Sequence, residues 1–345
     1  MSRTALAPHT AVSLRTRRWV ALGAALVLLA VALVLSLALG ARGIELSQVW
    51  PALFSPEAGN NDHLVIRELR LPRTIVGLLA GLALGVAGSV MQGVTRNPLA
   101  DPGLLGVNAG ASLAVVFAIS VLSIVNPTGY IWFAFAGAAA AASVVYAIGS
   151  LGREGATPVK LVLAGTAVTA GITSVISLIL ISDTDTLNTF RFWSVGSLAS
   201  RDLEAVRIVI AFVVGGLILA AISGRMLNLV ALGDDLARGL GQRIYVSRAV
   251  SAGAVVLLCG SATALAGPIV FVGLVVPHIV RPFTGPDYRW IIAVSAVIGP
   301  SLLLIADIVG RLIVSPSELE AGLVVAVIGA PVMIALVRRV KLVGL

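Results

Sequence analysis

The sequence predicts an all-α membrane protein with ten transmembrane helices, and three observations carry this prediction. First, eight stretches between Val20 and Val337 contain no Asp, Glu, Lys or Arg. Each is long enough for a membrane-spanning helix, which needs about 17–25 mostly apolar residues. Second, the 345 residues are 58% hydrophobic and 12% charged, whereas soluble domains carry about 25% charged residues. Third, the apolar runs are continuous rather than alternating, so helices and not a closed barrel would satisfy the backbone in lipid.

Six of the charge-free stretches each predict one span, and the other two predict two spans each. At about 1.5 Å per residue, a single helix through either of those two would overshoot a hydrocarbon core of about 30 Å. The chain breaks the first at 126–129 and the second at Gly267-Pro268. The ten predicted spans are 19–41, 74–95, two within 102–152, 161–182, 208–224, two within 249–280, 290–306 and 321–337.

The distribution of charge predicts the orientation. If the N-terminus is cytoplasmic, the inner segments hold 16 basic and 5 acidic residues, and the outer segments hold 8 basic and 11 acidic residues. Basic residues gather in cytoplasmic loops, so both termini are expected in the cytoplasm, in a multi-pass protein of the cytoplasmic (inner or plasma) membrane. The first apolar run is too long for a cleaved signal peptide and is interpreted as a retained helix. We therefore expect a cytoplasmic tail at 1–18 and a single transmembrane domain at 19–345.

Three segments outside the spans are long enough to matter. Residues 42–73 are interpreted as an outer loop, with Pro51 and Pro56, and residues 182–207 as an outer segment. Residues 225–248 lie inside and mix Leu and Ala with charges at helical spacing, which favours one or two short interfacial helices over a solvated connector.

Small residues recur every four positions in two of the predicted spans. In the second span they form an extended ridge, and in the fifth span Thr169, Thr173 and Ser177 continue a similar ridge from Gly165. Such ridges let helix backbones approach closely, so we expect helix packing at both. The ridge of the second span consists of Gly77, Gly81, Gly85, Ser89 and Gly93.

Several kinds of chemistry are not encoded in the sequence. Neither lysine, Lys160 or Lys341, follows a glycine, so a phosphate-binding Gly-Lys-Ser/Thr loop is excluded and the chain is not expected to hydrolyse ATP. The three histidines are scattered, and we predict no catalytic residue and no metal site. The high positive charge is explained by membrane topology, without nucleic acid as a partner. The spans lack internal carboxylates, apart from Asp307 near an outer end, where its spacing allows a pair with Arg311. This argues against an ion-coupled secondary carrier, which needs a site for its coupling ion.

Several strings of the sequence are specific enough to compare with known families. They are 69–73 (LRLPR), 96–107 (RNPLADPGLLGV), 227–229 (LNL), 271–281 (FVGLVVPHIVR), 306–311 (ADIVGR) and 328–331 (IGAP). In order and spacing, these strings resemble the FecCD family of ABC importer permeases, which move ferric siderophores, haem or vitamin B12. The resemblance covers nearly the whole chain from about Glu45, and one departure is Glu320, where the family usually has proline.

The resemblance implies a type II ABC importer permease fold and a set of partners. Two permease subunits, either copies or paralogues, would work with two cytoplasmic ATPases and an extracytoplasmic substrate-binding protein. No cofactor is expected in this chain, because ATP and Mg would be held by the partner ATPases. The chain is therefore expected to be a transport subunit rather than an enzyme, with a ferric siderophore as cargo. The alternatives are haem or vitamin B12 as cargo, an ion-coupled carrier acting alone, or an intramembrane enzyme.

The resemblance also implies roles for named residues. Arg70, Arg73 and Arg311 would dock the binding protein, the alternative being local pairing with Glu68 or Asp307. The segment 225–248 would couple to the ATPase. The coupling residues are expected to be Leu232, Gly233, Asp234, Ala237 and Gly241; the candidates for the translocation path and its outer gate are Thr169, Thr173, Ser177, Trp193 and Gly196.

Overall fold

The computed structural model describes residues 13–40, 42–151, 157–199 and 203–343, and every regular element in them is a helix. Seven helical stretches are long and apolar enough to cross a membrane, and three further apolar helices are shorter. These correspond one for one to the ten predicted spans, so the predicted fold class is confirmed. The seven are α1 (Leu14–Ala38), α3–η1–α4 (Asn61–Thr95), α6 (Pro127–Gly149), α7 (Pro158–Ser182), α9 (Leu203–Val230), α11 (Ile244–Ala266) and α13 (Tyr288–Ile313). The shorter three are α5 (Val107–Leu122), α12 (Val272–Thr284) and the apolar part, Ala321–Ala335, of α14 (Ala321–Val343).

The first helix begins earlier than its apolar run. Helix α1 starts at Leu14, and the Ser13 hydroxyl caps it by accepting a hydrogen bond from the Thr16 backbone N–H at 3.2 Å. The last five residues of the predicted tail at 1–18 are therefore helical, and residues 1–12 lie outside the described residues. The helix extends N-terminal to the predicted span at 19–41 because residues 14–18 are compatible with a helix and Ser13 caps it.

The outer segment 42–73, interpreted above as a loop, is mostly helical. It folds into α2 (Leu46–Phe54), α3 (Asn61–Leu64) and the π-helix η1 (Val65–Arg70), which runs directly into α4 (Leu71–Thr95). Apolar side chains of this segment, such as Ile66 and Ala52, are buried against the end of α1 and form a small separate core. Pro51 and Pro56 favour a loop, but the apolar residues of this segment are spaced so that helices bury them against α1, and the helices form.

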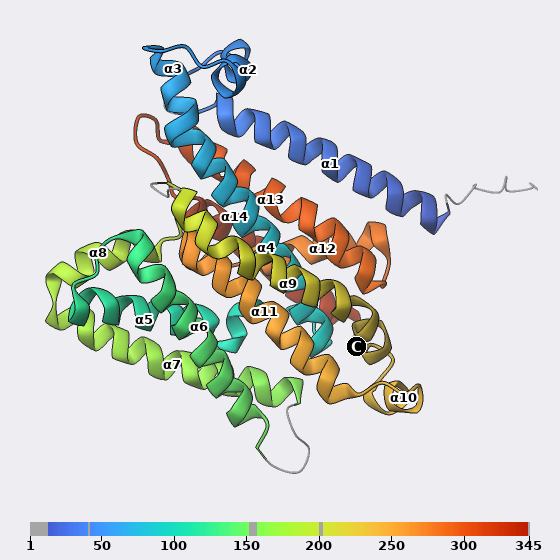
Figure 1. Ribbon diagram of the computed structural model, residues 1–345. Coiled ribbons are helices and arrows are strands. Elements are labelled where there is room, and N and C mark those ends of the chain that lie inside the picture. Colours follow the sequence, from blue (N-terminus) through green and yellow to red (C-terminus); the bar gives the residue numbers. More distant parts are fainter. Residues whose placement is uncertain (1–12, 41, 152–156, 200–202, 344–345) are drawn as a thin grey trace, which may run out of the picture.

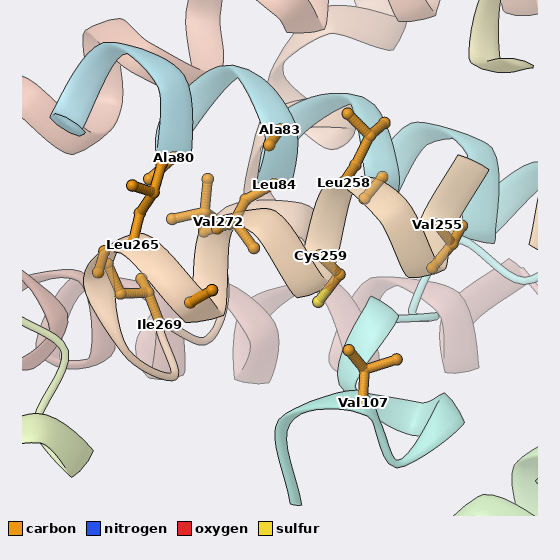
Figure 2. Close-up of a cluster of buried hydrophobic side chains, with 14 of the residues drawn as sticks. Ala80, Ala83, Leu84, Val107, Val255, Leu258, Cys259, Leu265, Ile269 and Val272 are labelled. Carbon is orange, nitrogen blue, oxygen red and sulfur yellow. The ribbon is translucent and has the colours of Figure 1, made fainter. Parts of the chain in front are cut away.

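Helix α4 passes through the middle of the bundle, with α11 and α13 on either side (Figure 1). Figure 2 shows Ala80, Ala83 and Leu84 of α4 lying along Leu258 and Leu265 of α11. The ridge of small residues on α4 is confirmed as a packing surface. A Cβ added to Gly81 would lie 2.5 Å from the Pro300 Cα, and one added to Gly88 would lie 1.9 Å from the Gly273 carbonyl oxygen. The backbones of α12 and α13 thus approach α4 as closely as glycine permits.

Two of the short helices follow irregular backbone that lies within the bundle. Helix α5 follows the 3₁₀ turn η2 (Pro102–Leu105), and α12 follows the connector 267–271. The start of α12 meets η2 beside α4, because a Cβ on Gly273 would lie 2.7 Å from the Pro102 Cδ and 3.2 Å from the Gly88 Cα. Irregular backbone is tolerated within a membrane protein where other protein segments surround it.

The helices at the periphery keep exposed apolar faces. Only 17% of the most apolar window of α7 and 22% of that of α1 is buried within the chain. Helices α5 to α8 form a group at one side of the bundle, and α1 lies along the opposite edge beside α13 (Figure 1). Exposed apolar surface of this extent needs lipid or another subunit to cover it.

Candidate functional site

An outer arginine cluster forms where η1, α4 and α13 meet; we use this name for Arg70, Arg73, Asp307, Arg311 and Glu318. The Asp307 carboxylate is wholly buried between Arg73 at 2.8 Å and Arg311 at 3.1 Å. Arg73 also pairs with Glu318 at 2.5 Å. The predicted pairing of Asp307 with Arg311 on one helix face is confirmed, and the tertiary fold adds Arg73 to it.

The same cluster holds the outer end of α1. Arg70 Nη1 donates to the Leu37 carbonyl at 2.8 Å, and Arg311 Nη1 donates to the carbonyls of Ser36 at 3.0 Å and Leu39 at 2.7 Å. The last carbonyls of a helix lack intrahelical partners and carry partial negative charge, so cations bind there favourably. Two arginines from distant parts of the chain therefore cap α1 and fix it to α4 and α13.

The three arginines line a recess of about 350 Å³ together with Arg42, Glu68 and Glu318. Arg70 is 5% exposed, Arg73 9% and Arg311 2%. The predicted docking residues are thus brought together, but at the bottom of a recess and not on a flat surface. A partner could reach them only with a side chain long enough to enter. Charge reversal of these arginines would disrupt the buried cluster and would not test docking alone.

The inner segment 225–248 contains one short helix, α10 (Asp234–Gly239), in agreement with the predicted interfacial helix. Gly233 and Gly241 flank it with φ of 111° and 83°, conformations that favour glycine. Asp234 accepts from Arg248 Nη2 at 2.8 Å and also pairs with Arg96 at the end of α4. These ion pairs fasten α10 to α4 and α11.

The side chains that α10 exposes are only partly those expected. Leu232 is 56% exposed, as a residue presented to a partner should be, whereas Ala237 is fully buried and Asp234 is engaged in the ion pairs above. Leu236 and Leu240 are 64% and 62% exposed, and the motif-based prediction missed Leu236 and gave Leu240 no role. The spacing of four between Leu236 and Leu240 places them on one helix face, but it does not say whether that face is exposed.

The outer gate candidates lie where three connections meet. Trp193 lies in the last turn of helix α8 (Thr184–Ser194); it is 2% exposed and packs edge-on against Tyr130 with ring centroids 6.4 Å apart. Gly196, at φ 79°, accepts a hydrogen bond from the Gly322 N–H at 3.0 Å at the start of α14. A Cβ on Gly267 would lie 2.3 Å from the Trp193 carbonyl oxygen. Movement of α8 would therefore displace α14 and the connector before α12.

The Asp183 carboxylate, which is half-buried, lies at the start of α8. Asp183 caps the helix, accepting from the Thr186 hydroxyl at 2.5 Å and from the Thr186 and Asp185 backbone N–H groups at 3.1 Å. These hydrogen bonds, chiefly that of the Thr186 side chain, lower the pKa of Asp183 below its ordinary value because they stabilise the charged form.

Two of the three candidates on α7 face away from the core. Thr173 and Ser177 are exposed and Thr169 is half-buried. The hydroxyls of Thr173 and Ser177 donate to the carbonyls four residues earlier, at 2.8 and 2.9 Å. They can line a path only if this face of α7 meets another subunit. Within the described part of the chain, no group of three or more His, Cys, Asp or Glu side chains is placed to hold a metal ion.

Comparison with known proteins gives concordant results. The family model described as the FecCD transport family matches residues 28–339. The ferric enterobactin transport system permease protein FepD of Escherichia coli is 44% identical over 95% of this chain and 97% of its own length. The iron(3+)-hydroxamate import system permease protein FhuB of Bacillus subtilis is 43% identical over 92% of this chain and 82% of its own. A metal-chelate type ABC transporter solved in an inward-facing conformation has a TM-score of 0.80 at 25% identity and covers 93% of this chain and 99% of its own; this likeness confirms the predicted permease fold.

Proposed function

This chain belongs to the FecCD transport family and is a membrane-embedded permease of the ABC import type, and we propose that its cargo is a ferric siderophore. Two relatives above 40% identity support this cargo, since one is named for ferric enterobactin and the other for iron(3+)-hydroxamate. Haem and vitamin B12 are the alternative cargoes. We place the chain in the cytoplasmic membrane with both termini inside, on the strength of the charge distribution.

We propose that transport is powered by partner subunits. Two ATPases would bind at the inner ends of two permeases, which are copies or paralogues, and ATP and Mg would reside in those ATPases. The observation that favours such a contact is the exposed row of Leu232, Leu236 and Leu240 on and beside α10. Apolar side chains at this spacing fit a groove on a partner. Because Asp234 ties α10 to α4 and α11, a shift of the ATPase would move these long helices as units.

We propose that the outer arginine cluster receives an acidic side chain of an extracytoplasmic binding protein. The cluster holds three guanidinium groups against two carboxylates, so one positive charge is left in excess. Glu318 is the more accessible of the two carboxylates, with its side chain 33% exposed, and it competes for Arg73. An incoming carboxylate could take its place, because guanidinium groups bind carboxylates in the same planar geometry.

This docking site can be tested by removing the competitor. The Glu318→Gln variant leaves Arg73 paired with Asp307 and raises the excess charge of the recess, so the binding protein should bind more tightly. Glu57→Gln, an exposed change on the same outer side, is the matched control. Affinity of the purified binding protein for the permease in nanodiscs is the measurement. Equal affinities in both variants would show that docking does not use this cluster.

Transport itself is tested by reconstitution. Proteoliposomes with the partner permease, the ATPases and a binding protein loaded with ferric enterobactin should accumulate iron in proportion to ATP hydrolysis. Haem and vitamin B12, each with its own binding protein, serve as comparison cargoes. Uphill uptake by this chain alone, or uptake abolished by an uncoupler while ATP is present, would overturn the proposed mechanism in favour of an ion-coupled carrier.

A further inference from the structure

A groove of about 1000 Å³ opens between α1, α9 and α13 at the ends that the charge distribution assigns to the cytoplasm. It lies on the side of the bundle where α1 runs along α13, away from the group formed by α5 to α8 (Figure 1). Its walls are apolar and come from four helices. The wall residues that matter most here are Leu22, Val86, Leu217, Ala221, Ala293 and Ala296.

The groove has the depth of one membrane leaflet. Its lining on α9 runs from Leu217 to Met226, which at 1.5 Å per residue is about 14 Å along the helix. Half of a hydrocarbon core of about 30 Å is about 15 Å. Small residues, Ala221 on α9 and Ala293 on α13, keep it open. The space therefore suits an extended acyl chain that enters from the level of the headgroups.

Two arginines stand at the mouth of the groove. Arg225 on α9 and Arg289 on α13 are both exposed and both line it. The helices that carry them meet closely here, since a Cβ added to Gly224 would lie 3.4 Å from the Arg289 Cγ. Within the described part of the chain, neither guanidinium group makes a hydrogen bond or an ion pair. Two neighbouring cations without a carboxylate partner are complementary to a phosphate group.

The acidic residue nearest in sequence, Asp287, is already engaged. Its carboxylate accepts from the Asn228 side chain at 2.7 Å and lies 3.7 Å from Arg18 Nη1. Arg18 also donates to the Thr284 carbonyl at 2.8 Å. Asp287 is thus held by other groups at the start of α13, and the positive charge at the groove mouth remains for a ligand.

Two tryptophans mark the membrane interface at the same place. Trp19 of α1 and Trp290 of α13 both line the groove, and their rings meet edge to face with centroids 5.1 Å apart. Tryptophan is enriched at the level of lipid headgroups, so the mouth of the groove lies where a phospholipid phosphate would be. Basic pockets between transmembrane helices on the cytoplasmic side are typical of anionic lipid headgroup sites.

We propose that this groove is a specific site for an anionic phospholipid of the cytoplasmic leaflet. Arg225 and Arg289 bind the phosphate of the headgroup, the tryptophan pair borders it, and an acyl chain lies between α1 and α9 over Val86 of α4. The lipid would complete the packing of α1, which the chain itself buries only in small part. This site is independent of the proposed cargo and of the outer docking site.

Native mass spectrometry of the full-length chain in mild detergent, with added cardiolipin, phosphatidylglycerol or zwitterionic phosphatidylcholine, tests the proposal. The wild type should retain the two anionic lipids in preference to phosphatidylcholine. The R225Q/R289Q variant should bind them roughly 30-fold more weakly. Each arginine near a membrane surface raises the affinity for an anionic lipid roughly fivefold, and the two factors multiply. The matched control is R15Q/R17Q, which removes two exposed arginines from the same end outside the groove. Equal losses in the two variants would overturn the site, since general surface attraction would then explain binding.

A second variant separates the apolar groove from the charge. Ala293→Phe fills the groove while leaving both arginines, and it should reduce lipid retention even if R225Q/R289Q is not recovered folded. Unchanged retention in Ala293→Phe would overturn the acyl-chain placement. A photo-crosslinking residue at Ala221, used in native membranes, should give a lipid adduct; an adduct with a polypeptide instead would show that a protein subunit occupies the groove and would refute the proposal.

Discussion

Neutralising Asp307 perturbs the outer arginine cluster at its centre. The substitution Asp307→Asn keeps the shape of the side chain but removes the charge that lies between Arg73 at 2.8 Å and Arg311 at 3.1 Å. Asp307 is wholly buried and Arg311 is 2% exposed, so water cannot replace the lost carboxylate. The variant therefore leaves buried positive charge without its main partner.

The expected loss of stability follows from what each arginine retains. Removing one partner of a buried ion pair costs about 3–5 kcal/mol. Arg73 keeps Glu318 at 2.5 Å, and Arg311 keeps the Ser36 and Leu39 carbonyls at the end of α1. The asparagine oxygen also remains an acceptor. These residual contacts place the expected loss at the lower end of the range, about 3 kcal/mol.

Unfolding of the purified protein in mixed micelles with increasing dodecyl sulfate measures this loss. Asp235→Asn is the matched control, because Asp235 pairs with Arg238 at the surface, where the two side chains are 99% and 60% exposed. Surface ion pairs contribute little, so the control should unfold nearly as the wild type does. If Asp307→Asn were as stable as the control, the outer arginine cluster would not contribute to the free energy of unfolding and the reasoning would be refuted.

Three further outcomes are expected. Gly88→Ala places a methyl group on the Gly273 backbone and should lower stability by at least about 1–3 kcal/mol, measured by the same unfolding assay, whereas Gly171→Ala, with open space around its Cβ, should not be destabilising. Leu236→Asp places a charge in the exposed leucine row of α10 and should reduce copurification of the ATPase without altering the amount of folded permease; full copurification would contradict the coupling proposal. The cap at Asp183 should be lost only in acid: its pKa is lowered in the folded state, so the stabilisation of α8 is complete above the ordinary value of about 4 and declines as pH falls through the lower folded value. Hydrogen exchange of α8 amides should show this decline in the wild type and not in Asp183→Ala, and a loss of protection already near neutral pH would argue against this assignment.

The sequence predicted most of the helices because their signals are local. Charge-free length, breaks at proline and glycine, and spacing of small residues each depend on a few neighbouring residues, and all ten predicted spans are helices in the structure. It did less well at 42–73, where α2, α3 and η1 replace the expected loop. The turn residues there were visible, but the buried partners of Ile66 on α1 were not.

The candidate sites were likewise predicted only in part from the sequence. The sequence alone identified the three outer arginines and the inner segment 225–248. It could not indicate that Ala237 turns inward while Leu236 and Leu240 face outward, because that depends on how α10 packs against α9 and α11. The direction in which a short helix faces is decided by its neighbours and not by its own residues.

What the sequence by itself determined is the class of the molecule: a helical membrane bundle, with its spans and its family, because hydrophobic length and sequence motifs are properties of the chain. Only the tertiary structure decided that Arg73 meets Asp307 across 234 positions of the chain, that Asp234 fastens α10 to Arg96, and that Arg225 and Arg289 share the mouth of one groove. The physical reason is that charge pairing and cavity shape depend on distance in space, which helix packing sets and local sequence does not.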